Sequence, residues 1–305
     1  MTEKQHFQLV ENIKSPGKIY NKIISATINF NSEITPYYTD SNTTIFKSDC
    51  LEILSRLPDE SIDMIFADPP YMLSNDGFTC QNGRMVTVNK GKWDKSKGLE
   101  NDLQFHDTWI SACRRVLKPQ GTIWISGTYH SIYQCGYLLQ KNNFHILNDI
   151  AWFKPNASPN LSCRFFTASH ETLLWARKNK NAKHTFNYTE MKNGFFPEDK
   201  LKKANTQMRS VWSIPTTAGS EKEFGKHPTQ KPLALLKRII SASTNDYDII
   251  LDPFNGSGST GIAAALLKNR YYIGIEIDTN FCELTKKRLQ NILPNSEELL
   301  NAASE

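Results

Sequence analysis

Short apolar runs alternate with segments of helical period along most of this 305-residue chain, and this alternation restricts the fold more than any other feature. The predicted strands cover residues 43–49, 61–68, 121–127, 146–153, 170–178, 247–252 and 271–278. The predicted helices cover residues 50–57, 103–117, 130–142, 232–244, 260–268 and a last segment that ends near 292. Strands joined by helices pair in parallel, because each helix returns the chain to the edge where the previous strand began. We therefore expect an α/β fold with a doubly wound, mostly parallel sheet.

Three stretches interrupt this alternation. Residues 1–40 show no sustained period and are expected to form an arm or a peripheral element. Residues 72–100 are polar, rich in Asn, Gly and Lys, and longer than a plain connector inside a compact domain, so we expect a functional or disordered loop. Residues 179–225 lose the period among Lys, Asn, Gly and Pro, and we interpret them as an inserted recognition module.

The net charge of +5 permits a polyanionic partner but does not require one. Basic residues gather in three loop-like runs, although such runs are more often solvated faces than binding surfaces. They are Lys90, Lys92, Lys95 and Lys97; Arg177, Lys178, Lys180 and Lys183; and Lys200, Lys202 and Lys203. The six cysteines lack the spacing of a zinc site, and no run approaches the ~18 apolar residues of a membrane span. We therefore expect a cytoplasmic protein with reduced thiols and neither membrane nor metal.

The buried strand 61–68 runs directly into the element DPPY, residues 68–71. The two prolines end the strand, and open α/β sheets bind ligands at this carboxyl end. Asp68 and the carbonyl of Pro69 can each accept one N–H of an exocyclic amine on a nucleic-acid base, while Tyr71 offers a ring face for stacking. Such a base must first be flipped out of a duplex. A plain strand-ending turn capped by Asp68 is the alternative.

A second strand ends in the glycine-rich turn DPFNGSGSTGIAA, residues 252–264. Its glycines fit the GxGxxG pattern, and Glu276 follows Gly256 by twenty residues, as in dinucleotide-binding folds. Asp252 at the strand end would repel a pyrophosphate, whereas it would attract the ammonium and sulfonium of S-adenosylmethionine. The acidic strand end therefore favours the methyl donor over a dinucleotide. Glycines that only permit close packing of helix on strand are the remaining alternative.

With DPPY first and the Phe254-Asn255-Gly256-Ser257-Gly258 turn last, the sequence resembles the beta group of amino-DNA methyltransferases over nearly all of residues 43–292. The resemblance implies a Rossmann-like methyltransferase fold with permuted motif order. It implies that the catalytic residues are Asp68, Pro69, Pro70 and Tyr71. It implies that the donor site comprises Asp49, Cys50, Asp68, Thr229, Gln230, Lys231, Asp252, Phe254, Gly256, Gly258, Thr260 and Glu276. The HPTQKP element (227–232) resembles the segment that closes over the donor, although Pro232 also suits a helix start.

In that family, Asp at the first catalytic position usually accompanies adenine N6 and Ser accompanies cytosine N4. Both bases carry an exocyclic amine, so cytosine stays open as an alternative. The stretches DPPYMLSNDG, GKWDK, PNLSCRFFTASHETLLWARK and GKHPTQKP resemble the second adenine methylase of DpnII-type GATC restriction-modification systems. This implies duplex DNA and single-stranded DNA as substrates, a restriction endonuclease as genetic partner, and a homodimer. Methylation of RNA or protein, or a non-catalytic DNA-binding role, are the competing hypotheses.

The resemblance also divides the chain. The expected parts are an N-terminal arm (1–40), a catalytic half (41–178), a target-recognition insert (179–225), a donor-binding half (226–292) and a C-terminal tail (293–305). Aromatic and basic side chains near the insert are candidates for stacking on bases or for meeting phosphates, and each can equally belong to the core. These candidates are Trp93, Arg164, Phe165, Phe166, Trp175 and Arg209.

Overall fold

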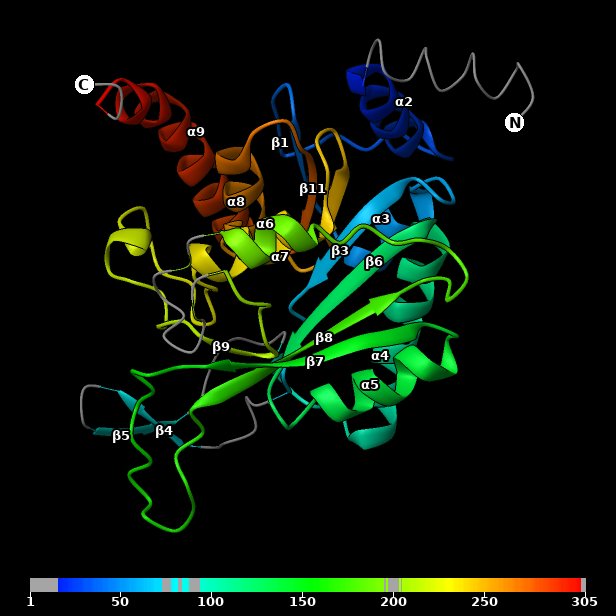
Figure 1. Ribbon diagram of the computed structural model, residues 1–305. Coiled ribbons are helices and arrows are strands. Elements are labelled where there is room, and N and C mark those ends of the chain that lie inside the picture. Colours follow the sequence, from blue (N-terminus) through cyan, green and yellow to red (C-terminus); the bar gives the residue numbers. More distant parts are fainter. Residues whose placement is uncertain are drawn as a thin grey trace.

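The computed structural model describes residues 16–72, 78–81, 84–87, 94–194, 196, 203 and 205–302, without the side chains of 78–81, 84–87 and 293–302. Its centre is a twisted sheet in the order β1-β2-β11-β10-β3-β6-β8-β7-β9 (Figure 1). The strands are β1 Tyr38–Thr39, β2 Thr43–Lys47, β3 Ile62–Ala67, β6 Leu117–Gly127, β7 His145–Phe153, β8 His170–Arg177, β9 Val211–Ser213, β10 Ile249–Asp252 and β11 Tyr271–Glu276. A separate hairpin pairs β4 (Phe78–Gln81) with β5 (Arg84–Thr87).

Most strand pairs are parallel. The strands β2, β11, β10, β3 and β6 run in one direction, whereas β8 lies antiparallel between β6 and β7. From β10 the chain crosses to β11 on one side, and from β3 it crosses to β6 on the other, so the topological switch point lies between β10 and β3. The predicted α/β fold with a mostly parallel sheet is confirmed. A switch point is where open sheets of this kind bind their ligands.

Helices cover both faces of the sheet (Figure 1). They are α2 Pro16–Asn29, α3 Cys50–Arg56, α4 Leu99–Val116, α5 Ile132–Lys141, α6 Tyr188–Asn193, α7 Leu233–Ser243, α8 Ser259–Leu267 and α9 Thr279–Ala302, with a short 3₁₀ turn at Ser220–Lys222. Successive strand residues point to opposite faces, so Ile65 packs under α2 to α5 while Met64 and Phe66 pack under α7 to α9. Strands buried on both faces explain the nearly continuous apolar runs in the sequence.

Two stretches without a sequence period contribute to the core. Helix α2 lies within residues 1–40, and its Tyr20 is 1% exposed, stacked on Tyr271 and 2.9 Å from the carbonyl oxygen of Tyr272. Strand β9 lies within residues 179–225 and extends the main sheet by pairing in parallel with β7. Residues 1–15 lie outside the described part. Among the helices described, none is both long and apolar enough to cross a membrane.

Candidate active site

A pocket of about 330 Å³ lies at the carboxyl ends of β3 and β10, where the two sequence motifs meet. The pocket is lined by nearly all predicted site residues, namely Asp49, Cys50, Asp68, Pro69, Pro70, Tyr71, Thr229, Gln230, Lys231, Asp252, Phe254, Gly256, Thr260 and Glu276. Gly258 is not part of the lining. The two motifs are almost two hundred residues apart in sequence. The pairing of β3 with β10 brings them together.

The DPPY turn is held by a carboxylate from the far end of the 72–100 stretch. Oδ1 of the fully buried Asp94 accepts hydrogen bonds from the backbone N–H groups of Tyr71, at 2.8 Å, and Met72, at 2.9 Å. Met72 has a φ of 57°, a left-handed conformation that is costly for a side chain of its shape. Asp94 therefore stabilises a strained turn and fixes the direction in which Tyr71 points.

Replacing Asp94 by Ala is expected to reduce the free energy of unfolding by about 1.5–3 kcal/mol, because a buried and a part-buried backbone donor lose a charged acceptor. Asp94→Asn keeps an acceptor oxygen and should be milder. Urea denaturation of both variants measures this difference, with Asp246→Ala, an exposed carboxylate, as the control. Equal stabilities for Asp94→Ala and wild type would show that the turn holds without Asp94.

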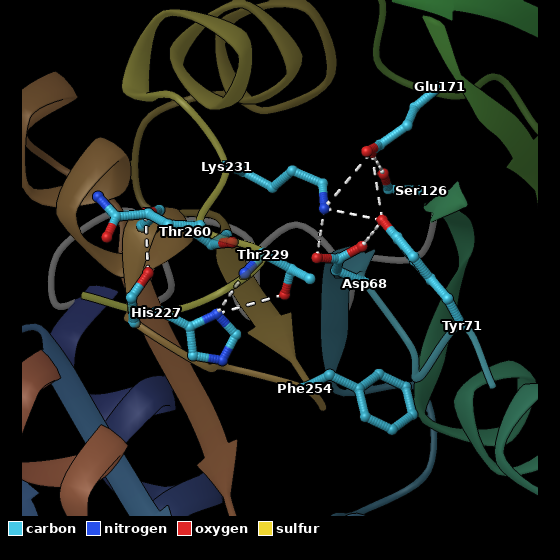
Figure 2. A network of polar contacts seen from close by, with 12 residues as sticks. Asp68, Tyr71, Ser126, Glu171, His227, Thr229, Lys231, Phe254 and Thr260 are labelled. Carbon is cyan, nitrogen blue, oxygen red and sulfur yellow. Dashed lines mark hydrogen bonds and ion pairs between the residues drawn. The ribbon is translucent and has the colours of Figure 1, made fainter. Parts of the chain in front are cut away.

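Lys231 lies at the centre of a buried polar network around Asp68 (Figure 2). Its Nζ donates to Asp68 Oδ2 at 2.5 Å and to the Tyr71 hydroxyl at 2.8 Å, and it lies 3.6 Å from Glu171 Oε2. The Tyr71 hydroxyl is 2.5 Å from Asp68 Oδ1 and 3.2 Å from Glu171 Oε2, so its single proton can serve either carboxylate. Both oxygens of Asp68 thus have a partner within the protein.

The two carboxylates of this network differ in basicity, because among the described residues Lys231 alone pairs with Asp68 whereas Lys231 and Lys154 both pair with Glu171. Burial raises the pKa of Asp68 above its ordinary value, against the opposing effect of Lys231. Burial also acts to raise the pKa of Glu171, but the ammonium groups of Lys231 and Lys154 outweigh it and hold that pKa below the usual range. Lys154 reaches Glu171 Oε1 at 2.5 Å. Asp68 is therefore the group that takes up a proton more readily, while Glu171 stays a counter-charge.

Two further carboxylates form an acidic cradle at the ends of β10 and β11. Asp252 accepts from the Thr260 hydroxyl at 2.6 Å and from the N–H of Phe254 at 3.0 Å. Glu276 accepts from the N–H of Gly256 at 2.7 Å, which ties the glycine-rich turn to β11. Burial raises the pKa of Asp252 and of Glu276 to about 7 each. A cationic ligand in this cradle would lower both values and be held by both charges.

The two glycines of the turn have different reasons to be glycine. Gly256 has a φ of 51° at the pocket wall, where an added Cβ would lie 3.2 Å from His227 Nε2. Gly258 has a φ of 74° and precedes α8, and its added Cβ would lie 2.5 Å from a methyl of Thr285 on α9. The sequence assigned Gly258 to the donor site, but its position is set by backbone conformation and helix packing.

The opposite end of the pocket is more apolar. Asp49 caps α3 by accepting from the N–H of Leu51 at 2.8 Å, and the buried thiol of Cys50 follows it. The ring of Phe254 packs edge-on against Trp109 at a centroid distance of 5.3 Å. An aromatic and aliphatic slot beside a capped helix start suits a flat heterocycle such as an adenine ring.

The segment 227–232 connects the cradle with the polar network. His227 accepts from the N–H of Thr229 at 3.2 Å (Figure 2). Its ring packs edge-on against Phe281 at a centroid distance of 4.2 Å. Four residues later, Lys231 reaches Asp68. The sequence singled out Thr229, Gln230 and Lys231 but not His227. It also treated Glu171 only as part of a strand, and HETLL carries no local signal beyond a charge that begins an apolar run.

The structure shows where several of the residues predicted to contact DNA lie, and whether they are exposed or buried. Trp175 is buried and stacked on Trp124 at 4.9 Å, so it belongs to the core. The run that starts at Arg177 follows the far end of β8, where Lys178 pairs with Glu60, so it lies at the edge opposite the pocket. Arg164, Phe165, Phe166 and Arg209 are exposed. Lys90, Lys92, Trp93, Lys200 and Lys202 lie outside the described residues.

Within the part described, no group of three or more His, Cys, Asp or Glu side chains could hold a metal ion.

Comparisons with known proteins agree with this geometry. A family described as DNA methylase matches residues 62–287. The type II methyltransferase M2.MboI of Moraxella bovis is 50% identical over 86% of this chain and 93% of its own. M2.DpnII of Streptococcus pneumoniae is 48% identical over 84% of this chain and 92% of its own. The solved M1.HpyAVI-SAM complex matches with a TM-score of 0.58 and 31% identity, covering 81% of this chain and 98% of that one.

Proposed function

Because the chain belongs to the DNA methylase family and is an adenine-specific DNA methyltransferase that uses S-adenosylmethionine, we propose that it methylates N6 of the adenine in GATC sites. The observation that carries this proposal is that the acidic cradle and the DPPY turn line one and the same pocket. The GATC target rests on the likeness to M2.MboI and M2.DpnII together with the motif stretches of the chain. A type II restriction-modification system, with an endonuclease as genetic partner, follows from the same likeness.

The residues of the cradle fit the methyl donor. S-adenosylmethionine supplies a methyl group on a sulfonium and also carries an ammonium group. We assign Asp252 to the cationic end of the donor and Glu276 to the ribose hydroxyls, with Asp49, Cys50 and Phe254 around the adenine ring. The pKa of Asp252, raised by burial to about 7, supports its assignment, since a cation relieves the cost of burying that charge. The pocket volume lies at the lower end of the range for small-molecule sites.

We assign the target amine to Asp68 and the carbonyl of Pro69. A flipped adenine that places N6 at Asp68 Oδ1 displaces the Tyr71 hydroxyl, which can then donate to Glu171 Oε2, 3.2 Å away. The ring of Tyr71 is left to stack on the base. The N6–methyl bond forms while the methyl–sulfur bond breaks with its electrons going to sulfur, and N6 releases one proton. Asp68 receives that proton, since burial raises its pKa.

The proposal is tested by methyl transfer from labelled S-adenosylmethionine to synthetic oligonucleotides with and without GATC, followed by nucleoside analysis. N6-methyladenine confined to the GATC oligonucleotides supports both the reaction and the target. Detection of N4-methylcytosine would show that cytosine is the target base instead of adenine. N6-methyladenine at another sequence would exclude GATC as the target site. The same assay on single strands tests whether they are substrates.

Light scattering of the pure protein tests the proposed homodimer. The recognition role of residues 179–225 is tested by replacing this segment with the corresponding segment of a relative that methylates another sequence.

Donor affinity is expected to rise as pH increases through about 7. Below that pH the cradle carboxylates must lose protons before they attract the cationic donor, and above it they are already charged. Binding at neutral pH should therefore release protons, which calorimetry in two buffers of different ionisation enthalpy measures. Glu276→Gln should weaken binding by about 10- to 100-fold and reduce the proton release, because it removes a charged hydrogen-bond partner. Unchanged affinity and proton release in this variant would exclude Glu276 from the donor site.

A further inference from the structure

The connection between β7 and β8 exposes two neighbouring aromatic rings. It spans residues 154–169 and leaves the sheet at the end of β7, the same edge at which Asp68 and Asp252 lie. In Figure 1 it projects from the sheet as the long green loop. Phe165 is 67% exposed and Phe166 is 98% exposed. Two phenylalanines presented to solvent at the catalytic edge favour a binding surface over a plain connector.

The exposure of these rings results from an internally bonded loop. The side chain of Asn160 accepts from the backbone N–H of Ser162 at 3.0 Å and donates to the carbonyl oxygen of Phe165 at 2.7 Å. The backbone N–H of Asn160 donates to the Thr167 hydroxyl at 3.2 Å. These bonds close the loop on both sides of the Phe165–Phe166 pair. These hydrogen bonds thus hold the backbone of the loop, while both rings are exposed to solvent.

The base of the loop is fixed to the catalytic network. Lys154, the first residue after β7, pairs with Glu171, which lies 3.2 Å from the Tyr71 hydroxyl. Asn156 donates to the Thr216 hydroxyl at 3.0 Å and accepts from the N–H of Thr216 at 2.9 Å. These contacts set the position of the loop relative to Asp68. A molecule that reaches the pocket from this edge therefore meets the loop as well.

We propose that Phe166, supported by Phe165, is a wedge that enters duplex DNA and stacks in the space left by the flipped target base. The proposal rests on the proposed function, since it requires a base to leave a duplex. An apolar ring that replaces the lost stacking repays part of the unstacking cost, and aromatic rings accept any base as neighbour. The exposed Arg164 beside the pair is placed to meet a backbone phosphate.

A wedge is needed on a duplex but not on a single strand, and this contrast provides the test. Phe166→Ala and the double variant with Phe165→Ala are compared with wild type on duplex and single-stranded oligonucleotides of one sequence. The variants are expected to lose about 5- to 150-fold in kcat/KM on the duplex and to keep wild-type activity on the single strand. An abasic site opposite the target should restore most of the duplex activity. Fluorescence of 2-aminopurine at the target position should show less flipping in the variants.

Tyr133→Ala provides the matched control, because Tyr133 is 75% exposed on α5, outside this loop. Equal losses on duplex and single strand would overturn the wedge and make the loop a general binding or structural element. Unchanged duplex activity in the double variant would also overturn it. Wild-type protein that methylates neither form of DNA would instead contradict the proposed function, so the two failures are distinguishable.

Discussion

Asp68→Asn is expected to lower kcat for methyl transfer by about 10²- to 10⁴-fold while leaving donor affinity close to that of wild type. The amide has nearly the same shape as the carboxylate but cannot take up the proton that N6 loses. It also presents a donor to Lys231 or Tyr71, where Asp68 accepts from both. Donor affinity is preserved because Asp252 and Glu276 lie on other strands and keep their own hydrogen bonds.

Single-turnover kinetics with labelled donor separate this loss from effects on product release, and calorimetry measures donor binding. Asp59→Asn is a suitable control, since that side chain is 72% exposed in a surface ion pair with Arg115. A folded Asp68→Asn variant with wild-type turnover would remove Asp68 from the chemistry. A variant that fails to bind the donor would place Asp68 in the donor site instead.

Lys231→Met is expected to reduce the free energy of unfolding by about 3–5 kcal/mol, because it removes one partner from a buried set of charges. Glu171 would keep its ion pair with Lys154, whereas Asp68 would lose its ion pair with Lys231. The pKa of Asp68, already raised by burial, would rise further. A carboxyl group with a raised pKa in the folded state favours folding at low pH and loses that contribution as pH rises through the raised value. The destabilisation should therefore be smaller in mildly acidic than in alkaline buffer.

Chemical denaturation of the variant at several pH values measures both effects. Adding Glu171→Gln to Lys231→Met should recover part of the lost stability, since it removes the negative charge that opposes ionisation of Asp68. Lys141→Met, which breaks the exposed pair with Asp107, should change stability little and gives the matched control. A pH-independent loss in Lys231→Met, or no loss at all, would mean that packing of the lysine stem matters more than its charge.

The amino-acid pattern was sufficient to predict the sheet, its mostly parallel strands and the two ends of the pocket. Strand and helix positions follow from the period of apolar residues, because burial on one or both faces is a local requirement. Asp68 and Asp252 were placed at the site by the same logic, since each ends a buried strand. The glycine-rich turn contributed to the prediction of the donor site, because glycines indicate a backbone conformation that a side chain would prevent.

The pairing of charged groups, in contrast, depends on how the chain packs in three dimensions. Glu171 contacts Tyr71 because β8 lies antiparallel beside β6, and nothing in the run HETLL distinguishes this strand order from others. Asp94 holds the DPPY turn from the end of a stretch with no period, and His227 meets the glycine-rich turn by a return of the chain. Apolar period reports whether a residue is buried but not what it is buried against. Contacts between residues far apart in sequence depend on strand order and loop paths, which are set by the packing of the whole chain.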